Sequence, residues 1–449
     1  MKKIISTLLV FISIINSYSV KAQDITFPDQ WMRANMFSNY NAFDSLGNGI
    51  VINQNGDNAI QQSEALRVYS LKLGYTNSIQ SLEGIQYFSN LRELEFIGSS
   101  MTDLSILNSL TDLRVLKCYN NTQLTTLNVS NFSKLKTLLC YGCKIAALDV
   151  SNLTSLETLD CKNNNLTSLN ITNCSKLKQL SCENNQITSL NASNLTNLET
   201  MTCQNNKLAT LTINGDTKLQ TMNCSNNLIT SLDANNLVNL KSLTCSKNKL
   251  NSITLLELIN LESLYCNDNQ IASLDLSNLS KLISLYTNNN LLTNIISLGC
   301  INLREFYCDN NQLTSISLNH LSNLQYFLCS NNNLSNIEVN GAITLKGLTL
   351  NNNQLATLNV SNLVNLLNLS CNQNRLTSLE VSNLTNLILL SFGNNMIPKI
   401  DVFNLVNLQT FNCSNNLIDT LNVTYLTKLV TLICNNNRIK KLNIRNLKL

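Results

Sequence analysis

The sequence has 449 residues, of which 44% are hydrophobic and only 13% are charged, and its formal net charge is +4. A positive excess this small and scattered argues against an electrostatic nucleic-acid interface and against a polybasic membrane anchor, so no nucleic-acid partner is expected. Only 2 Pro and 12 Gly leave little room for flexible linkers.

The first 22 residues have the pattern of an export signal. Lys2 and Lys3 precede an apolar run over residues 4–15, and small and polar residues end the segment at Ala22. A retained membrane helix is the alternative, but the run is shorter than the roughly 20 residues that such a helix needs. We therefore predict a signal peptide over residues 1–22 and no transmembrane segment. The mature protein is expected to be secreted, at the cell surface or in the periplasm.

Residues 23–66 precede the repeats and are expected to cap them. Within this segment, residues 53–64 follow the frame of a calcium-binding EF-hand loop. The candidate ligands are Asn53, Asn55, Asp57, Gln61 and Glu64. The fit is imperfect, because Asn replaces the Asp expected at the first position and Asn58 replaces the expected Gly. Two interpretations remain: weak calcium binding, or a degenerate loop that only helps to cap the repeats. No other cofactor is expected.

From residue 67 to residue 449 the sequence repeats one frame. One copy reads Leu156-Glu-Thr-Leu159-Asp-Cys161-Lys-Asn-Asn164-Asn-Leu166. Alternation of apolar and polar residues around Leu159 predicts a short strand with its apolar side chains facing inward, paired in parallel with the next strand. One coil alone cannot bury its apolar residues, so the coils must stack. Counting two less regular copies, marked by Leu73 and Phe96, the sequence predicts about 18 coils.

Two residue types recur at fixed places in this frame. Cys marks most coils, at positions 118, 140, 161, 182, 203, 224, 245, 266, 308, 329, 371, 413 and 434. Stacked side chains about 4.8 Å apart that point the same way are poorly placed for disulfides, which need facing Cβ atoms about 3.8 Å apart. We therefore expect buried free thiols. Metal ligation is not expected either, because the marker Cys positions have no His nearby.

An Asn stands three residues after nearly every marker, where the chain turns out of the strand. Representative members of this asparagine column are Asn164, Asn185, Asn206 and Asn227. A buried amide at such a place is expected to bond backbone groups of its own turn and of the neighbouring coil. The column is therefore predicted to be structural.

The pattern Leu-x-x-Leu-x-Cys-x-x-Asn-x-Leu resembles the leucine-rich-repeat family over nearly all of residues 67–449. Residues 82–91 and 102–107 look like the internalin subtype, and the later coils look like secreted surface repeat proteins of Bacteroidetes bacteria. The resemblance implies an α/β-type, right-handed solenoid with a parallel β-sheet on its concave face. It also implies short 3₁₀ or extended turns on the convex face, and binding or adhesion rather than catalysis.

Catalysis has few candidate groups in this sequence. His320 is the only histidine and falls on a predicted convex turn, so neither a Ser-His-Asp nor a Cys-His arrangement is expected, and we predict no enzyme. Two functions remain. One is an exported binding or adhesion protein that recognises a protein or glycan ligand, and the other is a structural spacer or envelope component without a specific ligand.

The outward positions of the strands change along the chain, which favours the binding protein. In residues 200–246 they are mostly small and polar, but in the following coils they become aromatic with an acidic edge. The candidate ligand-binding residues are Tyr265, Tyr286, Tyr307, Tyr326, Leu328, Glu305 and Asp309. Exposed tyrosines are frequent in protein interfaces and also suit sugar rings. The alternative is that stacked tyrosines only stabilise the sheet. Tyr119 and Tyr141 form a second candidate.

The sequence ends part-way into a further coil, over residues 442–449. No C-terminal sorting domain is recognisable, so the mode of anchoring stays open. Lys440, Lys441, Arg445 and Lys448 place like charges at this end, which disfavours end-to-end stacking. We therefore predict a monomer.

Overall fold

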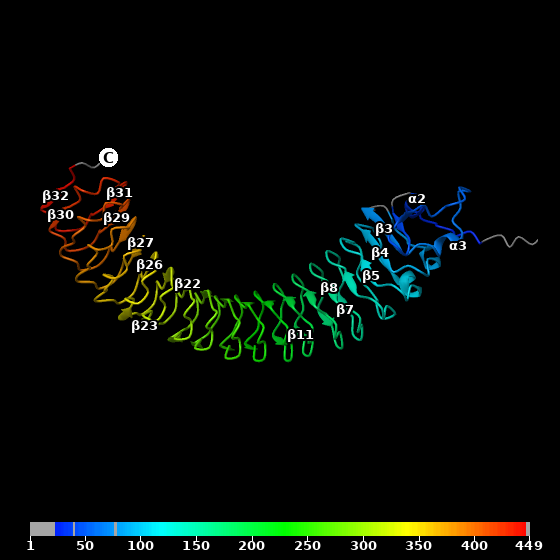
Figure 1. Cartoon of the computed structure of the whole chain (residues 1–449), viewed down its shortest axis with the longest axis horizontal. Helices are drawn as coiled ribbons and strands as arrows, with labels where there is room; N and C mark the ends of the chain where they lie inside the picture. The colour runs from blue at the N-terminus through cyan, green and yellow to red at the C-terminus, as the bar shows by residue number, and fades with distance from the viewer. Residues whose placement is uncertain (1–22, 39–40, 76–78, 446–449) are drawn as a thin grey trace, which may run out of the picture. The chain divides into compact units, whose positions relative to one another are not determined.

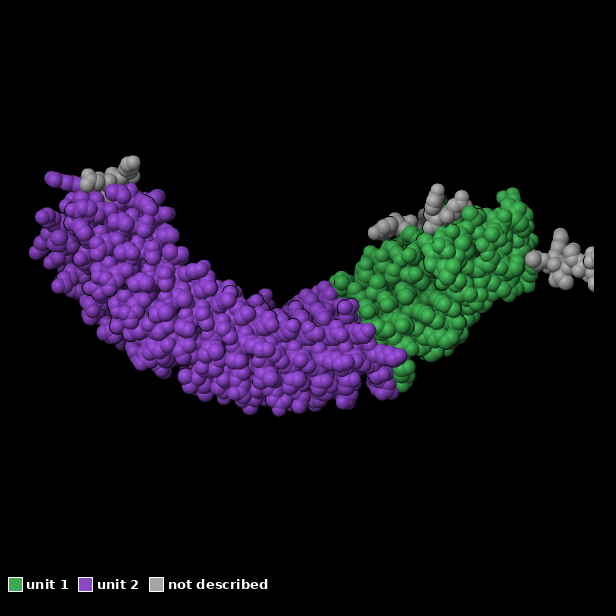
Figure 2. Space-filling model, in the orientation of Figure 1, with its two compact units in different colours: residues 1–166 green, residues 167–449 purple. Residues whose placement is uncertain are grey.

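The computed structural model describes residues 23–38, 41–75 and 79–445, so the predicted signal peptide lies outside the described residues. The chain forms two compact units, residues 1–166 (unit 1) and residues 167–449 (unit 2), coloured separately in Figure 2. Both consist of successive coils that place one strand in a parallel sheet (Figure 1). The predicted solenoid of about 18 coils is thereby confirmed.

Residues 23–66 belong to unit 1 and contain its α-helices, α2 (Gln30–Met36) and α3 (Gln62–Ala65). Helix α2 begins after Asp29, whose Oδ1 accepts hydrogen bonds from the first backbone N–H groups of the helix. The short strand β1 (Ala42–Phe43) pairs antiparallel with β2 (Gly49–Ile50) and with β3 (Ser70–Tyr75). This pairing covers the outer edge of β3, which would otherwise present free backbone groups to another chain.

Within each unit, the first strand of each coil pairs in register with the first strand of the next coil. In unit 1 these strands are β3, β4 (Glu93–Ile97), β5 (Val115–Lys117), β6 (Thr137–Leu139) and β8 (Thr158–Asp160). In unit 2 they are β10 (Gln179–Ser181), β12 (Thr200–Thr202), β14 (Thr221–Asn223), β16 (Ser242–Thr244), β18 (Ser263–Tyr265), β20 (Ser284–Tyr286), β22 (Glu305–Tyr307), β24 (Tyr326–Leu328), β26 (Gly347–Thr349), β27 (Asn368–Ser370), β28 (Leu389–Ser391), β29 (Thr410–Asn412) and β31 (Thr431–Ile433). The middle residue of nearly every strand is apolar and buried, so its two neighbours face outward.

Further three-residue strands lie on the extended returning arms of many coils. They are β7 (Ala147–Asp149), β9 (Ser168–Asn170), β11 (Ser189–Asn191), β13 (Thr210–Thr212), β15 (Ser231–Asp233), β17 (Ser252–Thr254), β19 (Ser273–Asp275), β21 (Asn294–Ile296), β23 (Ser315–Ser317), β25 (Asn336–Glu338), β30 (Thr420–Asn422) and β32 (Lys441–Asn443). The described 3₁₀ helices are η1 (Ile85–Tyr87) and η2 (Ser105–Ser109), both in unit 1. In unit 2, β26, β27 and β29 run along the concave side, and β23 and β30 lie on the opposite side (Figure 1).

The asparagine column holds neighbouring coils together through buried hydrogen bonds. The Nδ2 group of Asn164 donates to the carbonyl oxygens of Cys140, Cys161 and Lys162 at 2.9–3.2 Å. Its Oδ1 accepts a bond from the backbone N–H of Ile145 at 3.0 Å. Residues 140 and 145 belong to the preceding coil, so one amide connects two turns.

A second asparagine column, one position earlier, was not predicted. Its residues adopt positive φ angles, which asparagine tolerates better than most residues. Examples are Asn205 and Asn226, with φ of 57° and 54°. The Nδ2 group of Asn226 donates to Asn205 Oδ1 at 2.8 Å, and Asn205 donates to Asn184 Oδ1 at 2.7 Å. The turn therefore favours asparagine twice, for backbone conformation and for the contact with a neighbouring coil, although Lys247, Asp268 and Gln373 also adopt this positive φ.

Most of the cysteines form a column of buried thiols. None of the sixteen, all of which the structure describes, forms a disulfide, and only Cys434 is partly exposed. Burial raises the pKa of thiols such as Cys203 well above the ordinary value, so the reactive thiolate is scarce. The column acts as a line of small apolar side chains.

A native thiol-labelling experiment is expected to modify one cysteine quickly. Only Cys434, in the last marked coil, is accessible to a reagent such as an aromatic disulfide, and the remaining thiols react after denaturation. A Cys434→Ser variant removes the fast phase. Rapid labelling of several thiols in that variant would contradict the packing of the column.

Candidate functional site

The predicted tyrosines of unit 2 lie side by side on the outward face of the main sheet. The register pairs Tyr265 with Tyr286, Tyr286 with Tyr307 and Tyr307 with Leu328, and these four residues with Tyr326 are called the tyrosine stripe. The rings of Tyr265 and Tyr286 are stacked, with centroids 4.8 Å apart. Those of Tyr286 and Tyr307 meet edge to face at 4.5 Å. The first three rings are half-buried because each covers part of the next.

Glu305 lies at one edge of the tyrosine stripe. Its Oε2 accepts hydrogen bonds from the hydroxyl of Tyr286 at 2.9 Å and from Ser284 Oγ at 3.2 Å. Burial, and then the bond to this carboxylate, raise the pKa of the Tyr286 hydroxyl above its ordinary value. Burial and the Glu305 charge raise the pKa of Tyr307 in the same way. Both phenols therefore stay neutral at physiological pH and can donate hydrogen bonds.

Asp309 closes the stripe on the opposite side of Tyr307. Its Oδ1 accepts the backbone N–H of Ser330 at 2.7 Å, and its Oδ2 accepts Asn288 Nδ2 at 3.1 Å. Burial nevertheless raises the pKa of this carboxyl group. Asn288 Oδ1 is itself buried and accepts no hydrogen bond within the described part of the chain. This edge of the site therefore contains more acceptors than donors.

Tyr326 lies over Gly347 of the next strand. A Cβ atom added to Gly347 would come within 2.9 Å of Tyr326 Cδ1, so the missing side chain makes room for the ring. Tyr326 is 36% exposed and Leu328 beside it is half-buried. The stripe thus continues as an accessible aromatic surface, and the structure brings all seven predicted ligand-binding residues onto adjoining strands β18 to β24 and the turn after β22.

The second candidate, in unit 1, is also a stacked pair. The rings of Tyr119 and Tyr141 lie 4.5 Å apart with their planes 11° from parallel. Lys162 Nζ lies 5.3 Å from the centroid of the Tyr141 ring. The surface around this pair is charged, because Lys117 forms ion pairs with Glu93 and Glu95.

The EF-hand-like loop folds around its own side chains. Glu64 accepts the backbone N–H groups of Gln54 at 2.7 Å and of Gln61 at 3.1 Å. Gln61 Nε2 donates to Asp57 at 3.0 Å and to Asp24 at 3.1 Å. These residues with Asn55 and Ser63 line a cavity of about 520 Å³. Asn53 lies outside this lining, and its Oδ1 accepts the N–H of Gly56 instead.

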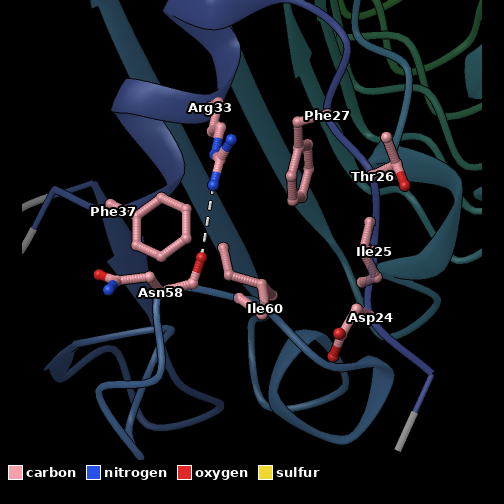
Figure 3. A pocket seen from close by; sticks show the side chains of 9 residues that line it. Asp24, Ile25, Thr26, Phe27, Arg33, Phe37, Asn58 and Ile60 are labelled. Carbon is pink, nitrogen blue, oxygen red and sulfur yellow. Dashed lines mark hydrogen bonds between the residues drawn. The ribbon is translucent and has the colours of Figure 1, made fainter.

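A separate pocket of about 230 Å³ lies between helix α2 and this loop (Figure 3). Phe27, Phe37 and Ile60 supply apolar walls, and Arg33 reaches across to the carbonyl oxygen of Asn58 at 3.4 Å. It is smaller than the roughly 300–1,000 Å³ typical of small-molecule sites. We place the candidate site on the sheet of unit 2 because that surface combines adjoining tyrosine rings with two carboxylates.

Within residues 23–38, 41–75 and 79–445, no group of three His, Cys, Asp or Glu side chains is placed to hold a metal ion. The single histidine, His320, has its Nε2 2.9 Å from the carbonyl oxygen of Ser297 and 3.1 Å from its hydroxyl. That contact joins two coils on the returning arm.

No helix in the described part of the chain is both long and apolar enough to cross a membrane.

Sequence reasoning missed three residues of these sites. Gly347 interrupts a column of larger outward residues, which is a visible signal for a close approach. Asn288 and Asp24 carry no such signal. Asn288 occupies an ordinary polar position, and Asp24 comes to the loop through a bridge with Gln61, far away in sequence.

Neither a known family pattern nor a curated protein matches this sequence, whereas many solved structures match the fold. The functional domain of InlJ from Listeria monocytogenes, described as including a cysteine ladder, is 28% identical with a TM-score of 0.55. That match covers 83% of this chain and 72% of the chain of that domain. YopM from Yersinia enterocolitica is 20% identical with a TM-score of 0.59, covering 85% of this chain and 90% of that chain.

The Arabidopsis receptor kinase HAESA, solved in complex with the peptide hormone IDA and the co-receptor SERK1, has the same fold at 20% identity and a TM-score of 0.60. The match covers 80% of this chain and 68% of HAESA. The repeated frame, the parallel coils and these likenesses together identify the chain as a leucine-rich-repeat protein.

Proposed function

We propose that this chain is an exported, non-enzymatic binding or adhesion protein that recognises a protein or glycan ligand through the tyrosine stripe. The observation that carries the proposal is the run of tyrosines across successive strands with carboxylates at both edges. Aromatic side chains on a rigid sheet offer a large contact area with little loss of side-chain entropy on binding.

The likenesses support a binding role. HAESA is a solenoid of this fold seen with a peptide ligand and a protein co-receptor, and InlJ shares the cysteine ladder. A spacer without a ligand has no need of a change from small polar residues to tyrosine in the middle of a sheet. Export follows from the N-terminal pattern of the sequence, and the basic C-terminal coil favours a monomer.

The proposal is tested by capture from host-cell and extracellular-matrix extracts with the full chain and with a triple variant, Tyr265→Ala, Tyr286→Ala and Tyr307→Ala. The variant is expected to lose the captured partner, with affinity reduced at least about tenfold as for interface hot spots. Its stability is expected to fall by only about 1–3 kcal/mol, from the lost ring contacts. Quantitative binding and thermal unfolding check the two effects.

A double variant in unit 1, Tyr119→Ala and Tyr141→Ala, is the matched control, since it removes a stacked pair of the same kind. It is expected to keep the partner. If the triple variant binds as the parent does and only melts earlier, the stripe is part of the scaffold. If the parent captures nothing specific, the spacer is favoured.

For the EF-hand-like loop we propose a capping role without calcium. Side-chain amides of Asn55 and Gln61 donate to Asp57, so donors of the loop occupy the place that a cation takes in an EF-hand. Calorimetric titration with millimolar calcium is expected to give no binding heat, and a chelator is expected to leave the melting temperature unchanged. A measurable heat together with a rise in melting temperature would overturn this role.

A further inference from the structure

The two carboxylates beside the tyrosine stripe, Glu305 and Asp309, form no ion pair within the described part of the chain, whereas several carboxylates of unit 1 do. Five ion pairs of unit 1 use Lys117, Lys134, Lys136 or Lys162. No Lys or Arg of the described chain forms an ion pair with Glu305 or Asp309. Both lie on a half-buried aromatic surface, where a charge is less well solvated than in open water.

The same surface is short of hydrogen-bond donors. Asp309 uses the only side-chain amide offered to it, and Asn288 Oδ1 remains buried without a donor. Burial raises the pKa of Asp309 despite its hydrogen bond from Ser330. A ligand with N–H donors and positive charge would supply both the missing hydrogen-bond donor and the missing cationic partner.

We propose that the tyrosine stripe binds a basic, extended segment of a protein partner, with a Lys or Arg side chain lying over Tyr307 between Glu305 and Asp309. This inference rests on the proposed function and specifies its ligand. Glu305 and Tyr307 face outward on β22 and Asp309 follows in the turn after it, so the carboxylates flank the ring in the sequence on both sides. The face of a tyrosine attracts a cation, and a carboxylate on each side adds charge-assisted hydrogen bonds.

Long-range attraction by the net charge of the protein does not explain the binding of a basic segment. The full chain carries a formal net charge of +4, which repels basic segments at long range. Selection for a basic partner must therefore come from the local acidic edges, and a change confined to those edges should abolish it.

The test uses an array of random peptides of about twelve residues, long enough to cross the stripe. It is probed with the full chain and with a Glu305→Gln, Asp309→Asn variant. Peptides bound by the parent are expected to be enriched in Lys and Arg, and this enrichment is expected to disappear in the variant. For one bound peptide, acetylation of its lysines or the double substitution is expected to weaken binding about tenfold each, a change of about 1.4 kcal/mol.

The matched control variant carries Asp275→Asn and Glu380→Gln, two exposed carboxylates away from the main sheet. It is expected to retain the selectivity and affinity of the parent. All variants are expected to unfold cooperatively, which shows that they are folded. Absence of bound peptides, absence of basic enrichment, or equal binding of the acetylated peptide overturns the proposal. If the triple tyrosine variant loses the captured partner but the double carboxylate variant keeps it, the binding function stands and the basic ligand is wrong. If the double carboxylate variant still binds a captured glycan, the ligand is a sugar instead.

Discussion

Replacement of Asp216 by asparagine is expected to make unit 2 more stable at neutral and alkaline pH. Asp216 occupies a place on the returning arm that Leu195 and Leu237 fill in the adjacent coils, and its side chain is completely buried. Its Oδ1 accepts the backbone N–H of Leu195 at 2.8 Å, while Oδ2 has no partner in the described chain. A buried carboxylate with half of its hydrogen bonds unmade destabilises the folded state.

The pH dependence has a defined sign. Burial raises the pKa of Asp216 from 3.8 to about 7 in the folded protein. The folded state therefore holds the proton more tightly than the unfolded chain, so stability is fully present below pH 4 and is lost as pH rises to about 7. A shift of this size corresponds to about 4 kcal/mol above pH 7, at 1.36 kcal/mol per pKa unit.

Asparagine retains the acceptor for Leu195 and removes the ionisation. Denaturant unfolding of the parent and of Asp216→Asn is expected to agree near pH 4 and to differ by about 4 kcal/mol at pH 8, with the variant more stable. Asp275→Asn serves as the control, because the pKa of this exposed carboxyl is lowered by hydrogen bonds from Ser277, so its loss acts in the opposite direction. A parallel pH dependence in parent and Asp216→Asn would show that the carboxylate is compensated.

The coil architecture was predictable because every coil must bury the same pattern of apolar side chains. The periodic leucines determine which side chains point inward, and a marker such as Cys161 is buried in the structure as its place in the frame predicts. The second asparagine column escaped prediction for a different reason. Asn163 is needed for its positive φ, and a backbone requirement is harder to recognise from side-chain alternation.

The candidate site was predictable only in outline. Alternation places Tyr286 and Tyr307 on one face, and parallel register brings them together. Their ring geometry, and the donor shortage at Asn288, depend on side-chain rotamers that the repeat frame does not specify. Asp216 was different, because a charged residue in a leucine column is visible in the sequence itself.

A substitution in the asparagine column is expected to produce the other large change in the free energy of unfolding. Asn227 is 6% exposed, and its Nδ2 donates to the carbonyl oxygens of Cys203, Cys224 and Ser225 at 3.0–3.3 Å. Its Oδ1 accepts the N–H of Leu208 at 3.0 Å. Substitution by alanine leaves buried backbone groups of two coils without partners, and each such group costs about 1–3 kcal/mol. We expect Asn227→Ala to lower the free energy of unfolding by roughly 3–5 kcal/mol.

A matched change on the surface separates this effect from the general cost of deleting an amide. Asn239 is exposed, and its Nδ2 makes one bond, to the carbonyl oxygen of Thr217 at 2.7 Å, so Asn239→Ala is expected to cost less than about 1 kcal/mol. Asn227→Asp keeps the shape but turns an oxygen toward three carbonyl oxygens, so it should be at least as damaging as alanine at pH 8 and recover partly at pH 4, where the acid can donate one hydrogen bond. Denaturant unfolding at both pH values measures these differences. Equal losses for the alanine variants at positions 227 and 239 would mean that the buried amide contributes no more than a surface one, and the column would then be a consequence of turn conformation rather than the link between coils.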